Sequence, residues 1–302
     1  MFDLIIIGSG PAGLSAAVYG KRAGLNLLVI EQNPVSGGQI LNTHEIDNYL
    51  GLPGINGFDM GRKFREHADN METEFVADMV TGLQKKKDSW EVVAAEGNSY
   101  EAKAVILAMG ARYSLLEVPG EQEFKGLGVS YCATCDGAFF KGMDVAVVGG
   151  GDVAVGDAIY LARMCRKVHL IHRRDSLRAA KSLQEKLFAC ENVEIHWDTT
   201  VEEIYGNDLV DGVVLLEGKE KKSTRLSVQG VFVAIGMRPN TAWLENVVDC
   251  DEGGYIKAGE DCVTGMPGIF AAGDIRTKMV RQIVTAVADG ACAAASVEKY
   301  LL

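Results

Sequence analysis

Cys132 and Cys135 are separated by two residues in the segment Tyr-Cys-Ala-Thr-Cys-Asp-Gly at positions 131–137. Two thiols at this C-x-x-C spacing can close a small disulfide ring, and the arrangement lowers the pKa of one thiol, as dithiol–disulfide catalysts require. A structural zinc site would need a second pair of ligands at short spacing, and the sequence has no other C-x-x-C pair. The spacing therefore predicts a redox-active pair and no metal site.

The side chains beside and beyond this pair support less specific predictions. Asp136 can act as a general acid that returns a proton to a leaving thiolate, or it can cap a helix or turn, and the sequence leaves both roles open. The other cysteines are expected to be small buried hydrophobic residues: Cys165, Cys190, Cys250, Cys262 and Cys292. The histidines indicate no shared site: His44, His67, His169 and His196.

A glycine-rich turn follows the first apolar segment, residues 4–7, and precedes a helix-like stretch. In this G-x-G-x-x-G turn, Gly8 permits a tight turn and Gly10 lets the backbone approach a pyrophosphate, which the N–H groups and dipole of the helix after Gly13 would bind. Glu31 ends the next apolar segment, residues 27–30, and can accept hydrogen bonds from ribose hydroxyls. The pattern predicts a dinucleotide site.

A second turn of the same kind contains Gly149, Gly151 and Ala154 between an apolar segment, residues 145–148, and a helix-like stretch. His172 follows Gly149 by 23 residues, as Glu31 follows Gly8. This unit has basic residues where the first has its acid: Arg173, Arg174 and Arg178. Guanidinium groups bind a 2′-phosphate in a bidentate manner, whereas a carboxylate would repel it. The second site is therefore predicted to prefer NADP to NAD.

Two copies of one nucleotide-binding architecture are the simplest interpretation of these repeats. Apolar strands that end at Gly110 and Gly236 indicate that both copies close in the same way. Residues 90–95, 193–196 and 213–216 are typical of short strands in an antiparallel layer or crossover beside a Rossmann-type sheet. The length of 302 residues suits about two domains. The predicted class is α/β with two Rossmann-like domains and a flanking antiparallel layer.

Charge and hydropathy exclude some partners and locations. The net charge of −11 disfavours nucleic acid and anionic membranes as partners. The basic runs at 85–87 and 219–222 are expected to be solvated loop or hairpin residues. The apolar N-terminal run is too short to span a membrane and lacks a basic leader. We therefore expect a cytoplasmic protein.

Taken together, the motifs resemble the low-molecular-weight thioredoxin reductases over nearly the whole chain. The segments that carry the resemblance are GSGPAG (8–13), SGGQ (36–39), CATCDG (132–137), GGGDVA (149–154), HRRDSLRA (172–179) and GIFAAGD (268–274). Glutathione reductase-like enzymes differ, because their redox cysteines lie further apart in the first domain and a long C-terminal dimerisation domain follows.

The resemblance implies an FAD-binding domain formed by residues 1–111 and 240–302. The NADPH-binding domain, residues 112–239, would be inserted into it and would carry the redox pair. NADPH would reduce FAD, FAD would reduce the Cys132–Cys135 disulfide, and the dithiol would reduce oxidised thioredoxin. In such enzymes Cys135 faces the flavin and Cys132 attacks the protein disulfide. A homodimer is also implied.

The resemblance also extends the set of expected cofactor residues. Asp274 would contact the ribityl chain, and four residues would lie near the flavin: Gln39, Asn48, Arg281 and Gln282. The other expected positions are Pro11, Ala12, Gly38, Gly110, Asp152, His172 and Gly273. The sequence departs from the family pattern near the expected nicotinamide position, at Met109, Val153, Gly156 and Asp157.

Other functions remain open at this point. A ferredoxin-dependent reductase of the same fold would lack the His-Arg-Arg segment, and a small-molecule dithiol oxidase would not need it. A flavoprotein acting on a peroxiredoxin would carry an added N-terminal thioredoxin-like module, for which Gly8 leaves no room. A nucleotide-sensing or zinc-stabilised binding protein is the alternative from another class, and it would lack flavin absorbance.

Overall fold

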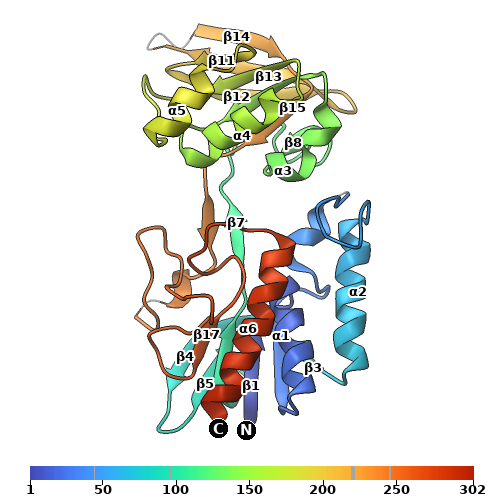
Figure 1. Ribbon diagram of the computed structural model, residues 1–302, viewed down its shortest axis with the longest axis vertical. Coiled ribbons are helices and arrows are strands. Elements are labelled where there is room, and N and C mark those ends of the chain that lie inside the picture. The colour runs from blue at the N-terminus through green and yellow to red at the C-terminus, as the bar shows by residue number, and fades with distance from the viewer. Residues whose placement is uncertain (44, 96, 219–221, 245) are drawn as a thin grey trace. The chain divides into compact units, whose positions relative to one another are not determined.

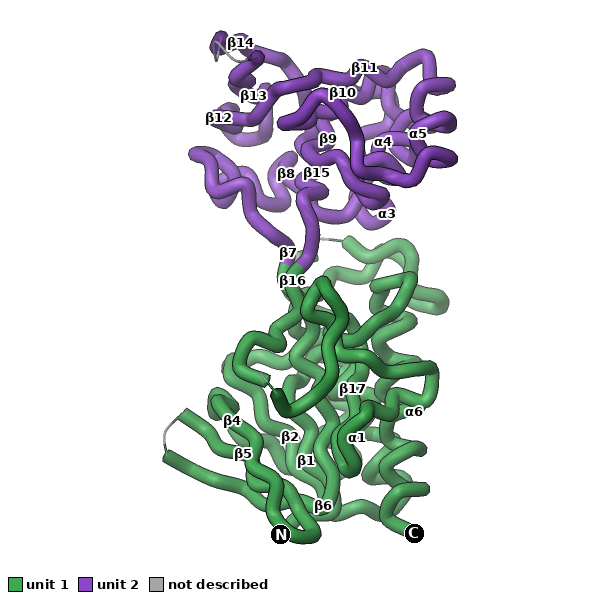
Figure 2. The backbone as a smooth tube through the Cα atoms, turned by 90° about the vertical axis from the view of Figure 1, so that its left-hand side faces the viewer, with its two compact units in different colours: residues 1–112, 238–302 green, residues 113–237 purple. Residues whose placement is uncertain are grey.

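The computed structural model describes residues 1–43, 45–95, 97–218, 222–244 and 246–302 (Figure 1). The chain forms two compact units (Figure 2): unit 1 is Met1–Arg112 with Arg238–Leu302, and unit 2 is Tyr113–Met237. Unit 2 is thus an insertion within the sequence of unit 1. His44 and residues 219–221 of one expected basic loop lie outside the described residues.

Unit 1 is built on a seven-stranded mixed sheet with the order β3-β2-β1-β6-β5-β4, and β17 pairs with β6. Strands β1, β2, β3, β6 and β17 are parallel, whereas β4 and β5 form an antiparallel extension. The strands are β1 Phe2–Ile7, β2 Leu27–Glu31, β3 Glu74–Ala77, β4 Val80–Lys85, β5 Trp90–Ala94, β6 Ser99–Leu107 and β17 Ile269–Ala271.

Residues 4–7 of the central strand β1 form a continuous apolar run and are buried, as expected for a strand with both faces covered. Leu4 and Ile6 pack toward the helices, and Ile5 and Ile7 toward the opposite core. Helices α1 and α6 lie side by side along this sheet (Figure 1). They approach closely because Gly290 has no side chain: a Cβ there would lie 2.1 Å from the Ala12 carbonyl oxygen. The helices of unit 1 are α1 Pro11–Arg22, η1 Gly38–Asn42, α2 Gly57–Asn70, η3 Ala242–Leu244 and α6 Ile283–Leu301.

Unit 2 contains a five-stranded parallel sheet with the order β11-β10-β9-β15-β8 and an antiparallel sheet β12-β13-β14. Its strands are β8 Val129–Ser130, β9 Asp144–Val148, β10 Lys167–Ile171, β11 Val193–His196, β12 Thr199–Gly206, β13 Val210–Glu217, β14 Lys222–Ser227 and β15 Gly230–Val233. Its helices are α3 Ala133–Asp136, η2 Gly137–Phe140, α4 Asp152–Ala162 and α5 Lys181–Phe188.

The parallel sheets, each with a strand, glycine turn and helix at its centre, confirm the predicted α/β class. The antiparallel layer is also present, in β12–β14, but Val193–His196 is the edge strand of the parallel sheet. Two short strands at the chain crossings between the units, β7 Ala111–Tyr113 and β16 Met237–Pro239, pair with each other. No helix in the described ranges has the length and apolar character needed to cross a membrane.

Candidate active site

The first glycine turn connects β1 to α1, and two of its glycines have different roles. Gly8 has a φ of +102°, and a Cβ there would lie 2.6 Å from the Ala108 carbonyl oxygen, so the protein's own backbone excludes a side chain. At Gly10 the nearest atom to an added Cβ is the Gly37 carbonyl oxygen, 4.0 Å away. Because internal packing does not require glycine at position 10, the missing side chain leaves room for a ligand to approach the backbone.

The segment 36–39 lies against this turn. The Gly37 amide donates to the Ser9 carbonyl at 2.9 Å, and an added Cβ at Gly38 would lie 3.3 Å from Gly10 Cα. Glu31 closes the other side, since its Oε2 accepts bonds from the Ser9 amide at 2.7 Å and the Ser9 hydroxyl at 2.9 Å. Glu31 is thus anchored at the turn where the sequence places it. The sequence does not predict this role of Ser9, because the motif specifies no residue type between its first two glycines.

The turn after β17 contains two buried polar atoms that have no partner among the described residues. They are Asp274 Oδ1 and Arg281 Nε. Burial raises the pKa of Asp274, against the opposing influence of Lys278 and Arg281. A buried polar atom without a hydrogen-bond partner destabilises the fold. A ligand with hydroxyl and phosphate groups would supply both missing partners, a donor for Asp274 Oδ1 and an acceptor for Arg281 Nε.

A buried charge network supports the same turn. Asp289 of α6 accepts bonds from the Gly273 amide at 2.9 Å, from Arg276 at 2.9 and 2.7 Å, and from Lys278 at 2.8 Å. Burial opposes ionisation of Asp289, but the bonds from Arg276 and Lys278 outweigh it and lower its pKa. The sequence indicated only a closely packed helix here, so Asp289, Arg276 and Lys278 were missed.

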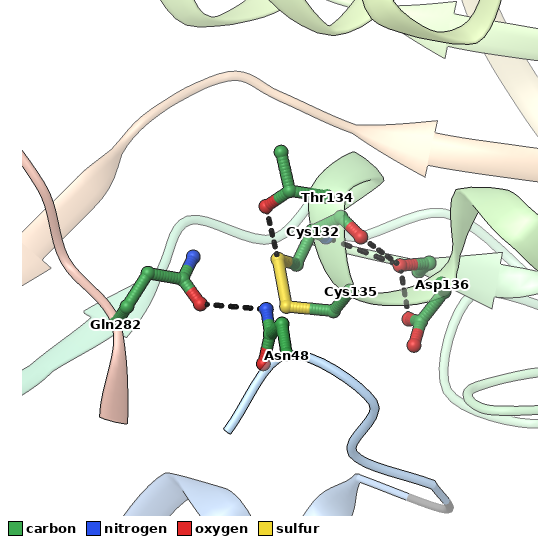
Figure 3. The surroundings of a disulfide bond; sticks show 7 residues. Asn48, Cys132, Thr134, Cys135, Asp136 and Gln282 are labelled. Carbon is green, nitrogen blue, oxygen red and sulfur yellow. Dashed lines mark hydrogen bonds between the residues drawn. A yellow bond between two sulfur atoms is a disulfide. The ribbon is translucent and has the colours of Figure 1, made fainter. Parts of the chain in front are cut away.

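Three further expected residues also lie in unit 1. The Gln39 side-chain amide donates to the Ala111 carbonyl. Asn48 Nδ2 donates to Gln282 Oε1 at 3.0 Å (Figure 3), so the structure brings these two residues together. Gln282 is the N-cap of α6 and forms a capping box with Thr285.

The second glycine turn connects β9 to α4 and repeats the division of roles. A Cβ at Gly149 would lie 2.4 Å from the Ala234 carbonyl oxygen, and the φ of Gly149 is +155°. Around a Cβ at Gly151, no atom of the described chain lies within 4 Å. Ala154 is fully buried at the third position. Open space thus adjoins the backbone at Gly151, as it does at Gly10.

The segment that carries the three arginines is fastened to this turn by its backbone and by His172. The buried His172 ring packs on Gly150, where an added Cβ would lie 2.1 Å from it. The Arg178 amide donates to the Gly150 carbonyl at 2.8 Å, and the Ala180 amide donates to Asp152 Oδ1 at 2.8 Å. The side chains of Arg173, Arg174 and Arg178 are exposed and form no ion pair with the described residues. The structure therefore holds three free guanidinium groups next to the turn.

Cys132 and Cys135 form a disulfide with their Cα atoms 5.3 Å apart (Figure 3). Cys132 is the N-cap of α3, and its carbonyl accepts bonds from the Cys135 and Asp136 amides at 3.2 and 3.1 Å. Both cysteines are half-buried, and Thr134 Oγ1 lies 3.4 Å from Cys132 Sγ. The short helix thus holds both cysteines in a partly exposed position.

Ser130 connects Asp136 to this pair. Its hydroxyl donates to Asp136 Oδ2 at 2.5 Å and accepts a bond from the Cys132 amide at 3.1 Å. Burial raises the pKa of Asp136, although the bond from Ser130 opposes the rise. A raised pKa favours the protonated carboxyl group, which can then act as a proton donor. Ser130 was not predicted, because nothing in the sequence marks a residue six positions before Asp136.

Two expectations about the remaining residues were wrong. Only Cys165 and Cys262 of the other five cysteines are buried, whereas Cys190 and Cys250 are partly exposed and Cys292 is exposed. Among the histidines, His169 Nδ1 and His196 Nε2 lie 3.0 Å apart, and Glu194 lies beside both. Strand pairing across 27 residues brings them together, which single-sequence spacing does not reveal.

The family model of the pyridine nucleotide-disulphide oxidoreductases matches residues 2–290. The chain belongs to this family. It is 46% identical to the thioredoxin reductase of Bacillus subtilis (strain 168), with 100% of this chain and 95% of the relative covered. Among solved structures, the thioredoxin reductase from Streptococcus pyogenes MGAS5005 has a TM-score of 0.94 at 45% identity and covers 100% of this chain and 98% of its own. The thioredoxin reductase from Giardia duodenalis has a TM-score of 0.93 at 32% identity and covers 99% and 98%.

These relatives and structures confirm the resemblance to the low-molecular-weight thioredoxin reductases and the two-domain Rossmann-like fold. The chain is accordingly an NADPH-dependent flavoprotein oxidoreductase with FAD and NADPH as its cofactors. The residues present fit both cofactors. The open backbone at Gly10 and Gly151 leaves room for a dinucleotide at each turn, and the unpaired buried atoms of Asp274 and Arg281 can bind hydroxyl and phosphate groups.

Proposed function

We propose that this chain is a thioredoxin-disulfide reductase that uses NADPH. The observation that supports it most strongly is that one unit contains both the Cys132–Cys135 disulfide and a glycine turn with three exposed arginines fastened beside it. A nucleotide-binding protein without redox function would not need the cysteine pair. An oxidase acting without NADPH would not need the arginines.

In this proposal the FAD domain comprises residues 1–111 and 240–302. Most of its cofactor contacts come from the first turn, the segment 36–39 and the segment after β17, and the others come from the end of β2, the loop before α2 and the residue before β7. The full set is Gly8, Gly10, Pro11, Ala12, Gly13, Glu31, Gly38, Gln39, Asn48, Gly110, Gly273, Asp274, Arg281 and Gln282. Asp274 is well suited to the ribityl hydroxyls, because its buried Oδ1 has no other described partner.

The NADPH domain comprises residues 112–239. Its contacts come from the second turn and the arginine segment: Gly149, Gly151, Asp152, Ala154, His172, Arg173, Arg174 and Arg178. The contacts of His172 with Gly150 and of Asp152 with the Ala180 amide support an indirect role for both side chains, which hold the arginine segment at the turn.

Bound FAD would relay two electrons from NADPH to the Cys132–Cys135 disulfide. The Cys132 thiolate then attacks one sulfur of the thioredoxin disulfide, which breaks that bond and forms a mixed disulfide. The Cys135 thiolate attacks Cys132 Sγ, restores the internal disulfide and releases the second thioredoxin thiolate. Asp136, whose pKa is raised by burial, supplies a proton to one leaving thiolate and is reprotonated from water, and the other thiolate takes its proton from water. Thioredoxin gains two electrons and two protons in each cycle.

The test is a disulfide-reduction assay with oxidised thioredoxin and one of three donors: NADPH, NADH or reduced ferredoxin. We expect turnover with NADPH, much slower turnover with NADH, and none with ferredoxin. The Cys132→Ser/Cys135→Ser double variant is the control, since it keeps both glycine turns. Turnover with ferredoxin but not with NADPH would replace the proposal with a ferredoxin-dependent reductase. Activity on a peroxiredoxin but not on thioredoxin would change the partner.

Two further features belong to the proposal: a homodimer and a cytoplasmic location. The absence of a membrane-crossing helix among the described residues agrees with this location, and the net charge of −11 disfavours nucleic acid as a partner. Light scattering during size-exclusion chromatography tests the dimer, and a mass of 32.5 kDa would contradict it. Fractionation of cells that express the chain tests its location.

A further inference from the structure

A cluster of three potential metal ligands lies in unit 2 on two neighbouring strands, away from the redox pair in sequence and in the sheet. His169 is in β10, and Glu194 and His196 are in the edge strand β11. In the parallel register Glu194 is opposite His169, and His196 is opposite Ile171. Alternation along each strand places all three side chains on the same face of the sheet.

The ligand atoms are close enough to share one ion. His169 Nδ1 and His196 Nε2 are 3.0 Å apart, His169 Nδ1 and Glu194 Oε2 are 3.9 Å apart, and His196 Nε2 and Glu194 Oε1 are 3.9 Å apart. Around a tetrahedral Zn²⁺, with bonds of about 2.0–2.2 Å, ligand atoms lie roughly 3.3–3.5 Å apart. Side-chain adjustments of less than about 1 Å would therefore convert this triangle into three zinc ligands.

We propose that His169, Glu194 and His196 form a binding site for Zn²⁺, with water in the fourth position. Two imidazoles and one carboxylate favour zinc and similar transition ions over Mg²⁺ or Ca²⁺. His169 is almost fully buried, so its ring is already oriented, while the exposed Glu194 and the partly exposed His196 leave a path for entry. The ion would fasten the edge strand to β10.

A neighbouring lysine orients one of the three ligands. Lys167 Nζ lies 2.5 Å from Glu194 Oε2. Glu194 can therefore bind the ion through Oε1 and keep Lys167 on Oε2. That arrangement orients the carboxylate but places a cation near the metal and reduces its affinity.

Zinc affinity of the full-length, FAD-loaded protein should be measured by competition with a chromophoric chelator, with Zn²⁺ as the only added ligand. The Cys132–Cys135 pair must be oxidised, so that its thiols do not bind the ion. We expect one equivalent to bind, and His196→Gln and Glu194→Gln each to weaken binding by at least about tenfold, since even an outer-shell partner is worth 10–100-fold. These two residues are not fully buried, so the variants should fold.

Matched controls and a gain-of-affinity variant sharpen the test. His67→Gln and Cys292→Ser change other exposed potential ligands and should leave zinc affinity unchanged. Lys167→Met should tighten binding, because it removes the neighbouring cation. With Co²⁺ in place of zinc, the visible bands of a tetrahedral ion should appear in the wild-type protein and not in His196→Gln. Equal affinity in wild type and His196→Gln, loss of binding in Cys292→Ser, or no stoichiometric binding at all would each overturn the proposal.

Discussion

Arg276 and Asp289 form a buried two-point salt bridge, with Nε 2.9 Å from Oδ2 and the terminal nitrogen 2.7 Å from Oδ1. Asp289 Oδ2 also accepts the Gly273 amide, so one carboxylate ties helix α6 to the turn that presents Asp274. Asp289→Asn would leave two buried cations without a counter-charge. Breaking such a pair costs about 3–5 kcal/mol, so we expect a lower Tm and faster loss of FAD. Released FAD is separated from the protein by ultrafiltration and measured by its fluorescence.

Glu298→Gln provides the matched control for that substitution. Glu298 lies on the same helix but is exposed, and no described residue forms a salt bridge with it. Removing its charge should change neither Tm nor FAD retention. If the two variants behave alike, the turn at Gly273 does not depend on Asp289.

Cofactor preference should reside in the exposed arginines. Arg173→Ala/Arg174→Ala should weaken NADPH binding by a few kcal/mol, because each charge-assisted hydrogen bond is worth about 1.5–3 kcal/mol. NADH has no 2′-phosphate, so its use should barely change. Steady-state KM values for both cofactors measure the effect, and Arg163→Ala, on the surface after α4, is a control of the same kind. Equal losses with NADPH and NADH would refute the assignment.

The two cysteines should differ in their reaction with a substrate disulfide. In prereduced Cys135→Ser, the Cys132 thiolate can attack but cannot be resolved, so a stable mixed disulfide with thioredoxin should accumulate. In Cys132→Ser no such adduct should form. Mass spectrometry of the reaction mixture, with no reductant added before the measurement, gives the amount of this mixed disulfide. Accumulation in Cys132→Ser instead would show that the two roles are reversed.

Asp157 should make the stability of unit 2 depend on pH. Burial raises its pKa to about 7, and the described residues offer it no hydrogen bond. Because the unfolded chain ionises this group near its ordinary pKa, folding is penalised increasingly as pH rises from about 4 to about 7, by about 1.4 kcal/mol per unit. Asp157→Asn removes the penalty. Its gain in Tm over wild type should therefore be larger at about pH 8 than at about pH 5.

An exposed carboxylate serves as the comparison for Asp157. Asp208→Asn, in the turn between β12 and β13, should show no pH-dependent difference from wild type. A gain in Asp157→Asn that is the same at both pH values would mean that Asp157 is solvated and titrates normally.

The backbone framework could be predicted because local chemistry determines it. Gly8 and Gly149 are each required by a carbonyl only 2.4–2.6 Å from a hypothetical Cβ, and such positions leave a clear pattern between an apolar strand and a helix. The equal spacing from Gly8 to Glu31 and from Gly149 to His172 likewise follows from a repeated strand–helix–strand geometry. These are properties of short segments, which a single sequence displays directly.

What the sequence did not reveal depends on tertiary contacts. Asp289 is a single acid among small residues, and its partners become evident only when α6 meets the turn after β17. His169 and His196 are neighbours through strand register, which periodicity does not specify. Ser130 lies in a two-residue strand, and its function depends on the fold of the following turn.

The fastening of the arginine segment to Gly150 uses main-chain atoms and the His172 ring, while the guanidinium groups themselves take no part. Positions 173, 174 and 178 can thus exchange side chains without a cost to the local scaffold. Cofactor preference is a separable trait in such an arrangement. A few surface substitutions could therefore change the preference between NADPH and NADH during evolution. The same substitutions could be used in protein engineering, provided that Gly150 and His172 are kept.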